Sequence, residues 1–128
     1  MSKKLLIDTN VIVRFLVEDN KGHFIKAVKI FEAIEEQKTE AFLLDFIVAE
    51  VVYVLKRVYK LEKKDIANAM QQLLMYENLY TENKLITYEA LSIYASKNID
   101  FADAYLCAKA KLESFEIVSF DKDLTKCL

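Results

Sequence analysis

Predicted strands and helices alternate along the whole of this chain, and that order is what most constrains its fold. Each of the first three short apolar runs typical of a buried strand is followed by two stretches whose apolar side chains have helical spacing. Helix pairs of this kind supply the crossovers that parallel strands need, so the order βααβααβααβ predicts an α/β domain. We expect a small central parallel sheet with helices on both faces. The expected strands are 4–7, 41–44, 79–81 and 116–120, and the expected helices are 10–18, 24–34, 47–59, 62–75, 87–97 and 101–112.

The composition is that of one globular domain covering residues 1–128. Hydrophobic residues make up 54% of the chain and charged residues 30%, which excludes a disordered chain. The net charge is −2, so a nucleic acid would have to be bound at one local site rather than by a general basic surface. One Gly and no Pro favour a body made mainly of helices.

The cysteines and the apolar runs predict a cytoplasmic protein. Cys107 and Cys127 form neither a CxxC pair nor a zinc-binding spacing, and we expect both to be reduced thiols, with Cys107 in the core. No apolar run approaches the roughly 20 residues that a membrane-spanning helix needs. We therefore expect no membrane partner.

A carboxylate interrupts the most apolar segment of the chain. Nine of the ten residues in 46–55 are apolar, and the tenth is Glu50. An unpaired carboxylate in the interior costs several kcal/mol, so a buried Glu50 needs a compensating partner. One interpretation is a buried ion pair with Arg57 or Arg14, and the other is a bound cation.

Four carboxylates are expected at the same end of the sheet. Asp8 follows the first predicted strand and Asp121 follows the last one, whereas Glu50 and Asp103 lie on helices near the same edge. Ligand sites in open parallel sheets gather at the carboxyl ends of the strands. These four residues are therefore the candidate site.

Three of these acids also have purely structural interpretations. Asp8 is placed to cap the first helix, and Asp121 is placed to open the final turn. Asp100 and Asp103 are spaced like a pair that caps the start of the helix 101–112. Four unrelated structural roles at one edge are a less economical account than one shared site.

A divalent cation would explain why the four acids converge. Two carboxylates 4 Å apart repel each other by about 4 kcal/mol at an effective dielectric constant near 20. Ligands that are all oxygen, with no His or Cys beside them, favour Mg²⁺ or Mn²⁺ over zinc. The sequence therefore predicts a magnesium or manganese site.

The chain resembles the PIN domain family, and in particular its compact toxin ribonucleases of the VapC type. The resemblance rests on four motifs in the family's order: DTNV at 8–11, AEVVYVL at 49–55, DFADAYLCA at 100–108 and VSFDKDL at 118–124. It covers essentially the whole chain. One departure is Ser119, which stands where many members have Thr and keeps the hydroxyl group.

The resemblance implies a metal-dependent endoribonuclease that hydrolyses RNA phosphodiester bonds. It implies Asp8, Glu50, Asp103 and Asp121 as both the catalytic residues and the ligands of Mg²⁺ or Mn²⁺. It further implies a protein antitoxin that blocks the site, and a homodimer. Auxiliary roles are expected for Asn10 and Ser119 from the motifs, and for Asp100 as a neighbouring acid.

Both the predicted RNA contact and the predicted catalytic activity have an alternative interpretation. The basic run 56–64, KRVYKLEKK, with Tyr53 and Tyr59 close by, is the candidate RNA contact, and its alternative is a solvated helix end. The alternative to a toxin nuclease is an inactive PIN-fold module for RNA binding or assembly, or a housekeeping nuclease that processes RNA. A phosphotransferase of the haloacid-dehalogenase type needs a second Asp where this chain has Asn10.

Overall fold

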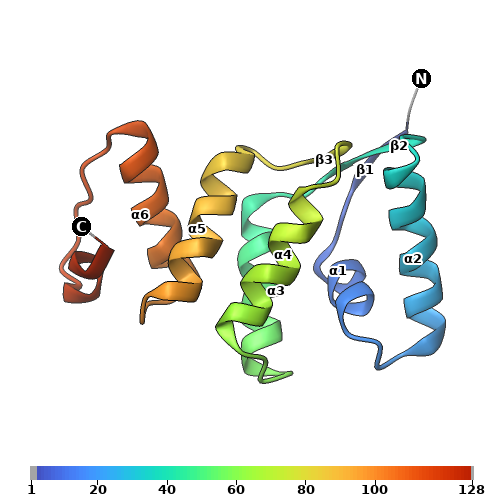
Figure 1. Ribbon diagram of the computed structural model, residues 1–128, viewed down its shortest axis with the longest axis horizontal. Coiled ribbons are helices and arrows are strands. Elements are labelled where there is room, and N and C mark those ends of the chain that lie inside the picture. Colours follow the sequence, from blue (N-terminus) through green and yellow to red (C-terminus); the bar gives the residue numbers. More distant parts are fainter. Residues whose placement is uncertain (1–2, 128) are drawn as a thin grey trace.

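The computed structural model describes residues 3–127, except for the side chains of residues 123, 125 and 126. Strands and helix pairs alternate as predicted up to the last helix (Figure 1). The elements are β1 (Lys3–Leu6), α1 (Thr9–Leu16), α2 (Lys21–Glu35), β2 (Thr39–Phe42), α3 (Asp45–Arg57), α4 (Lys63–Leu74), β3 (Leu79–Tyr80), α5 (Lys84–Ser96), α6 (Phe101–Glu113) and the 3₁₀ helix η1 (Lys122–Cys127).

The three strands form a parallel sheet in the order β1-β2-β3, which confirms the predicted α/β class. Successive side chains of a strand point to opposite faces of a sheet. One row, formed by Leu5, Ala41 and Leu79, is largely or fully buried. On the opposite face Leu6 is 76% exposed, so the described helices cover one face of the sheet more completely than the other.

Side-chain caps fix the start of several helices. Asn20 accepts a hydrogen bond from the backbone N–H of His23 at the start of α2, and Asn83 accepts bonds from two N–H groups at the start of α5. Helix α1 begins at Thr9, one residue before the predicted start of the first helix, so Asn10 lies in its first turn.

One core runs through the helices. Phe31 of α2, Leu55 of α3, Ile66 of α4 and Leu91 of α5 each expose 1% of their surface or less. Removing such a side chain beyond its Cβ costs about 2–5 kcal/mol of stability. No helix within residues 3–127 is long and apolar enough to cross a membrane.

The predicted fourth strand, 116–120, is wrong. This segment has no strand structure, and Val118 is 95% exposed. A strand needs a partner for its backbone N–H and C=O groups. Helix α6 instead carries the segment to the end of the molecule opposite α2, far from the sheet (Figure 1).

A disulfide bond connects Cys107 of α6 to Cys127 of η1, so the predicted reduced thiols are wrong in this structure. Cys107 is buried as predicted, and η1 folds back against α6 until the two Cα atoms are 5.9 Å apart. Half-cystines that are 20 residues apart are brought together by this return of the chain, which no local sequence pattern indicates.

Candidate functional site

Glu50 is exposed, so its predicted burial is wrong. The buried face of α3 is formed by Ile47, Val48, Val51, Val52 and Leu55, and Glu50 falls on the opposite side of the helix. Neither of the proposed ion-pair partners reaches it within the described structure. Arg14 pairs with Asp19 at 2.8 Å, and the guanidinium of Arg57 lies 5.7 Å from the centre of the Tyr53 ring.

Asp8 occupies the N-cap position of α1, but its side chain makes no capping hydrogen bond. Its backbone is extended, as is usual for a cap, and its side chain is exposed beyond the end of β1. Asp8 therefore has the position of a helix cap, but it lacks the side-chain hydrogen bond that would explain a carboxylate at this position. Asn10, two residues further along the chain, is also exposed.

Asp100 is the structural cap of α6. Its Oδ1 accepts a hydrogen bond of 2.9 Å from the backbone N–H of Asp103. The capping interpretation is correct for this residue, and the negative charge also suits the positive end of the helix dipole. The Asp103 carboxylate is half-buried in the first turn of the same helix.

Ser119 and Asp121 form a local turn before η1. The backbone N–H of Asp121 donates a 2.9 Å hydrogen bond to the Ser119 hydroxyl, and both residues are exposed. Because 116–120 does not join the sheet, this turn does not reach the end of β1 where Asp8 lies.

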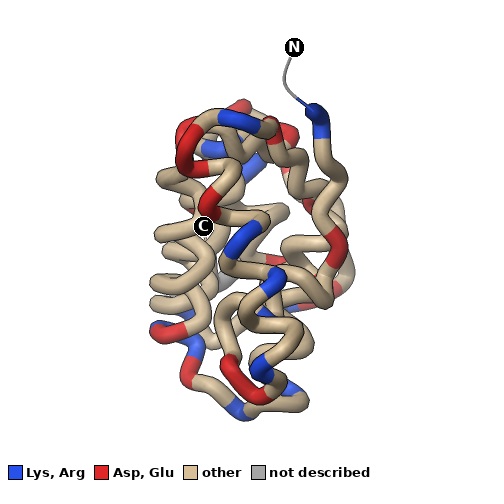
Figure 2. The backbone as a smooth tube through the Cα atoms, turned by 90° about the vertical axis from the view of Figure 1, so that its right-hand side faces the viewer, with Lys and Arg blue, Asp and Glu red and all other residues tan. Residues whose placement is uncertain are grey.

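The described residues contain no group of three or more His, Cys, Asp or Glu side chains that could hold a metal ion. Acidic and basic residues are interspersed along the chain (Figure 2). Two acids do share a groove between α3 and the start of α6, namely Glu50 and the capping residue Asp100. The predicted set Asp8, Glu50, Asp103 and Asp121 is thus not assembled in the described conformation.

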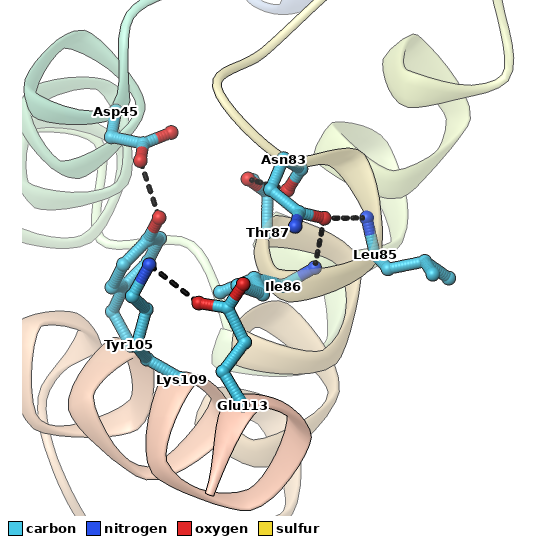
Figure 3. Close-up of polar contacts among 8 residues, drawn as sticks. All are labelled: Asp45, Asn83, Leu85, Ile86, Thr87, Tyr105, Lys109 and Glu113. Carbon is cyan, nitrogen blue, oxygen red and sulfur yellow. Dashed lines mark hydrogen bonds and ion pairs between the residues drawn. The ribbon is translucent and has the colours of Figure 1, made fainter. Parts of the chain in front are cut away.

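A polar contact absent from the sequence predictions joins the two helices that carry Glu50 and Asp103. The Tyr105 hydroxyl on α6 donates a hydrogen bond to Oδ2 of Asp45, the first residue of α3 (Figure 3). The other carboxylate oxygen of Asp45 is buried and has no hydrogen-bond partner in the described structure. On α6, Lys109 forms an ion pair of 2.6 Å with Glu113 beside this contact.

Burial governs the protonation of this pair. It raises the pKa of the Asp45 carboxyl, and the hydrogen bond from Tyr105 opposes that rise. Burial, together with the bond to Asp45, also raises the pKa of the Tyr105 hydroxyl, which therefore remains a donor at neutral pH. The two residues are 60 positions apart, and the only local signal is their closeness to the Glu50 and Asp103 motifs.

Comparison with known proteins identifies relatives of the whole chain. The family model described as "PIN domain" matches residues 5–127. A protein from Aquifex aeolicus (strain VF5) named "VapC ribonuclease" is 31% identical over 123 residues, which span 94% of this chain and 90% of that relative.

Proposed function

The chain belongs to the PIN domain family, and from this premise we propose that it is a metal-dependent endoribonuclease that hydrolyses RNA phosphodiester bonds. The observation that carries the proposal is the similarity over 94% of the chain to a protein named as a ribonuclease. All four acids of the predicted site lie within the matched residues 5–127, so the similarity covers every residue that the reaction would use.

We propose Asp8, Glu50, Asp103 and Asp121 as the catalytic residues and as the ligands of Mg²⁺ or Mn²⁺. Their carboxylates, with the Asn10 amide and the Ser119 hydroxyl close to them in the sequence, supply the oxygen ligands that these cations prefer. The chemistry of the donors fits the cation, but their arrangement in the described conformation does not. The proposal therefore requires the acids to move together when the cation binds.

Electrostatic repulsion gives a reason for the separation of the acids. Each pair of carboxylates brought to 4 Å would cost about 4 kcal/mol at an effective dielectric constant near 20. Asp8, Glu50 and Asp121 are instead exposed, where water stabilises their charges. A divalent cation would offset the repulsion and favour the assembled site.

The biological role that we propose is the toxin of a type II toxin–antitoxin pair. The support is the name of the relative, "VapC ribonuclease". On this proposal residues 1–128 form a single domain that is a homodimer and is inhibited by a protein antitoxin. A neighbouring gene for a small DNA-binding protein would support the pair, and its absence would favour a housekeeping RNA-processing nuclease.

The proposed activity is tested by incubating the purified protein with RNA in Mg²⁺, Mn²⁺ or EDTA. We expect cleavage with either cation, none with EDTA, and none from Asp8→Asn or Asp103→Asn. Asp65→Asn, which changes an exposed acid in the first turn of α4, is the matched control and should cleave normally. Cleavage by Asp8→Asn, or in EDTA, contradicts the proposal.

One structural observation favours an alternative function, a PIN-fold module that binds RNA or assembles with a partner without cleaving. That observation is the lack of an assembled metal site among the described residues. A calorimetric titration with Mn²⁺ separates the two functions. Binding that Asp8→Asn removes supports the nuclease, and no binding at millimolar Mn²⁺ supports the inactive module.

A further inference from the structure

A groove of about 600 Å³ runs between α3 and the start of α6. The α3 side chains that line it include Glu50, Tyr53, Lys56 and Arg57, in chain order along the helix. At 1.5 Å per residue, Arg57 lies about 10 Å from Glu50 along the helix axis. We call this hollow the α3 groove. Along α3, Glu50 lies toward one end of this groove, and Lys56 and Arg57 form its basic end.

The basic end of the α3 groove carries two cationic side chains at neighbouring positions of α3, Lys56 and Arg57. Neither Lys56 nor Arg57 forms an ion pair with a described acid, whereas Arg14 pairs with Asp19 and Lys109 with Glu113. Lys63 stands close by. Burial and the charge of Lys56 lower its pKa, and the Asp100 carboxylate, which also lines the groove, opposes that shift. Two adjacent cations that form no ion pair with a described acid favour an anionic ligand.

Two aromatic rings of the α3 groove are unusually open to solvent. Tyr53 is 60% exposed and Phe46 is 66% exposed, although both lie on a helix with a well-formed buried face. An exposed ring beside basic side chains is the arrangement on which unpaired bases stack, because every base offers a flat aromatic face. Arg57 already stands over the Tyr53 ring and provides a second planar surface.

We propose that the α3 groove binds single-stranded RNA, with Lys56 and Arg57 contacting phosphates and Tyr53 stacking on a base. The strand then runs along α3 toward Glu50, one of the proposed metal ligands. The choice of RNA as the ligand rests on the proposed function. Of the basic run 56–64, which the sequence predicts to contact RNA, only the first two residues line the groove.

Binding is measured by fluorescence anisotropy in EDTA, with a labelled single-stranded RNA of about 12 nucleotides, within the usual site size. Each of Lys56→Ala and Arg57→Ala should weaken binding several-fold. Each should also reduce the slope of log K against log salt by about 0.7, the value for one phosphate contact on a single strand. Tyr53→Ala should weaken binding by roughly 5- to 150-fold, and Tyr53→Phe should bind nearly as wild type, because stacking needs the ring alone.

Two control variants test whether RNA binding depends on the groove or only on the total positive charge of the protein. Lys26→Ala and Lys29→Ala, both on α2, remove the same charge from exposed positions outside the groove, and should leave the affinity nearly unchanged. Equal losses from these controls and from Lys56→Ala would overturn the proposal, and so would wild-type affinity in all three groove variants. The melting temperature of each variant shows that it is folded.

The outcome also separates this inference from the proposed nuclease activity. Loss of RNA binding in the groove variants, in a protein that never cleaves RNA, supports the groove and contradicts the nuclease. Cleavage by wild type, with unchanged RNA affinity in the groove variants, supports the nuclease and overturns the groove.

Discussion

Tyr105 of α6 donates a hydrogen bond to the carboxylate of Asp45, which begins α3, and this contact joins the helices that carry Asp103 and Glu50. The proposed metal ligands on these helices belong to segments 53 residues apart in the chain. Their relative position therefore depends on how α3 and α6 pack, and the Asp45–Tyr105 bond is a polar contact between those two helices.

Tyr105→Phe should lower the free energy of unfolding by about 1.5–3 kcal/mol, because a hydrogen bond to a charged acceptor is lost and the acceptor stays half-buried. Urea unfolding measures this change. Tyr88→Phe, which alters an exposed tyrosine of α5, is the control and should change stability little. Equal effects from the two variants would show that the Asp45 contact adds nothing to stability.

Asp45→Asn should change how stability depends on pH. The pKa of Asp45 is raised above its usual 3.8 by burial, so the folded state favours the protonated form. Its stabilising contribution is present below the unfolded pKa and is lost as the pH rises through the folded pKa. Wild type should therefore lose stability relative to Asp45→Asn as the pH rises from about 3.5 to neutral. Unfolding measured across this pH range checks the sign.

The stability of wild type relative to Asp19→Asn should depend on pH in the opposite direction. The pKa of Asp19 is lowered, first by the hydrogen bond from Tyr59 and also by Arg14, so its contribution is present above the usual 3.8 and is lost as the pH falls. Wild type should lose stability relative to this variant on acidification. The same sign for both aspartates would contradict the assigned environment of one of them.

Reduction of the Cys107–Cys127 disulfide should destabilise the fold. Opening a loop between cysteines 20 residues apart costs about 3 kcal/mol when the effect is assigned to the entropy of the unfolded chain. Calorimetry with and without dithiothreitol measures this loss. The double variant Cys107→Ser/Cys127→Ser should melt at the same temperature in both conditions. An intact mass equal to that of the fully reduced chain would show that the bond does not form.

Mn²⁺ should stabilise the protein if the four acids bind it together. A cation present at 100 times its dissociation constant adds about 2.7 kcal/mol to the free energy of unfolding, and this increment should disappear in Asp8→Asn. Small-angle scattering should also change on binding, because the described acids are not grouped before it. Stabilisation without a change in scattering would contradict the required movement of the acids.

The sequence predicted those parts of the fold that depend on local periodicity. The three strands of the sheet and all six helices lie close to their predicted ranges, because a short apolar run, or an apolar spacing of three to four residues, is a property of a single segment. The capping role of Asp100 was predicted for the same reason, since a cap and its N–H partner are only three residues apart.

Tertiary structure decided what depends on two distant segments. The segment 116–120 has a strand-like sequence, but whether it becomes a strand depends on a partner edge, and α6 carries it away from the sheet. Glu50 lies in an apolar run, yet its exposure depends on which side of α3 faces the core. The disulfide and the Asp45–Tyr105 bond likewise join residues 20 and 60 positions apart. The sequence by itself determined which chemical groups the chain carries and which segments coil or extend, because these follow from neighbouring residues. The distances between those groups follow from packing, which only the whole folded chain defines.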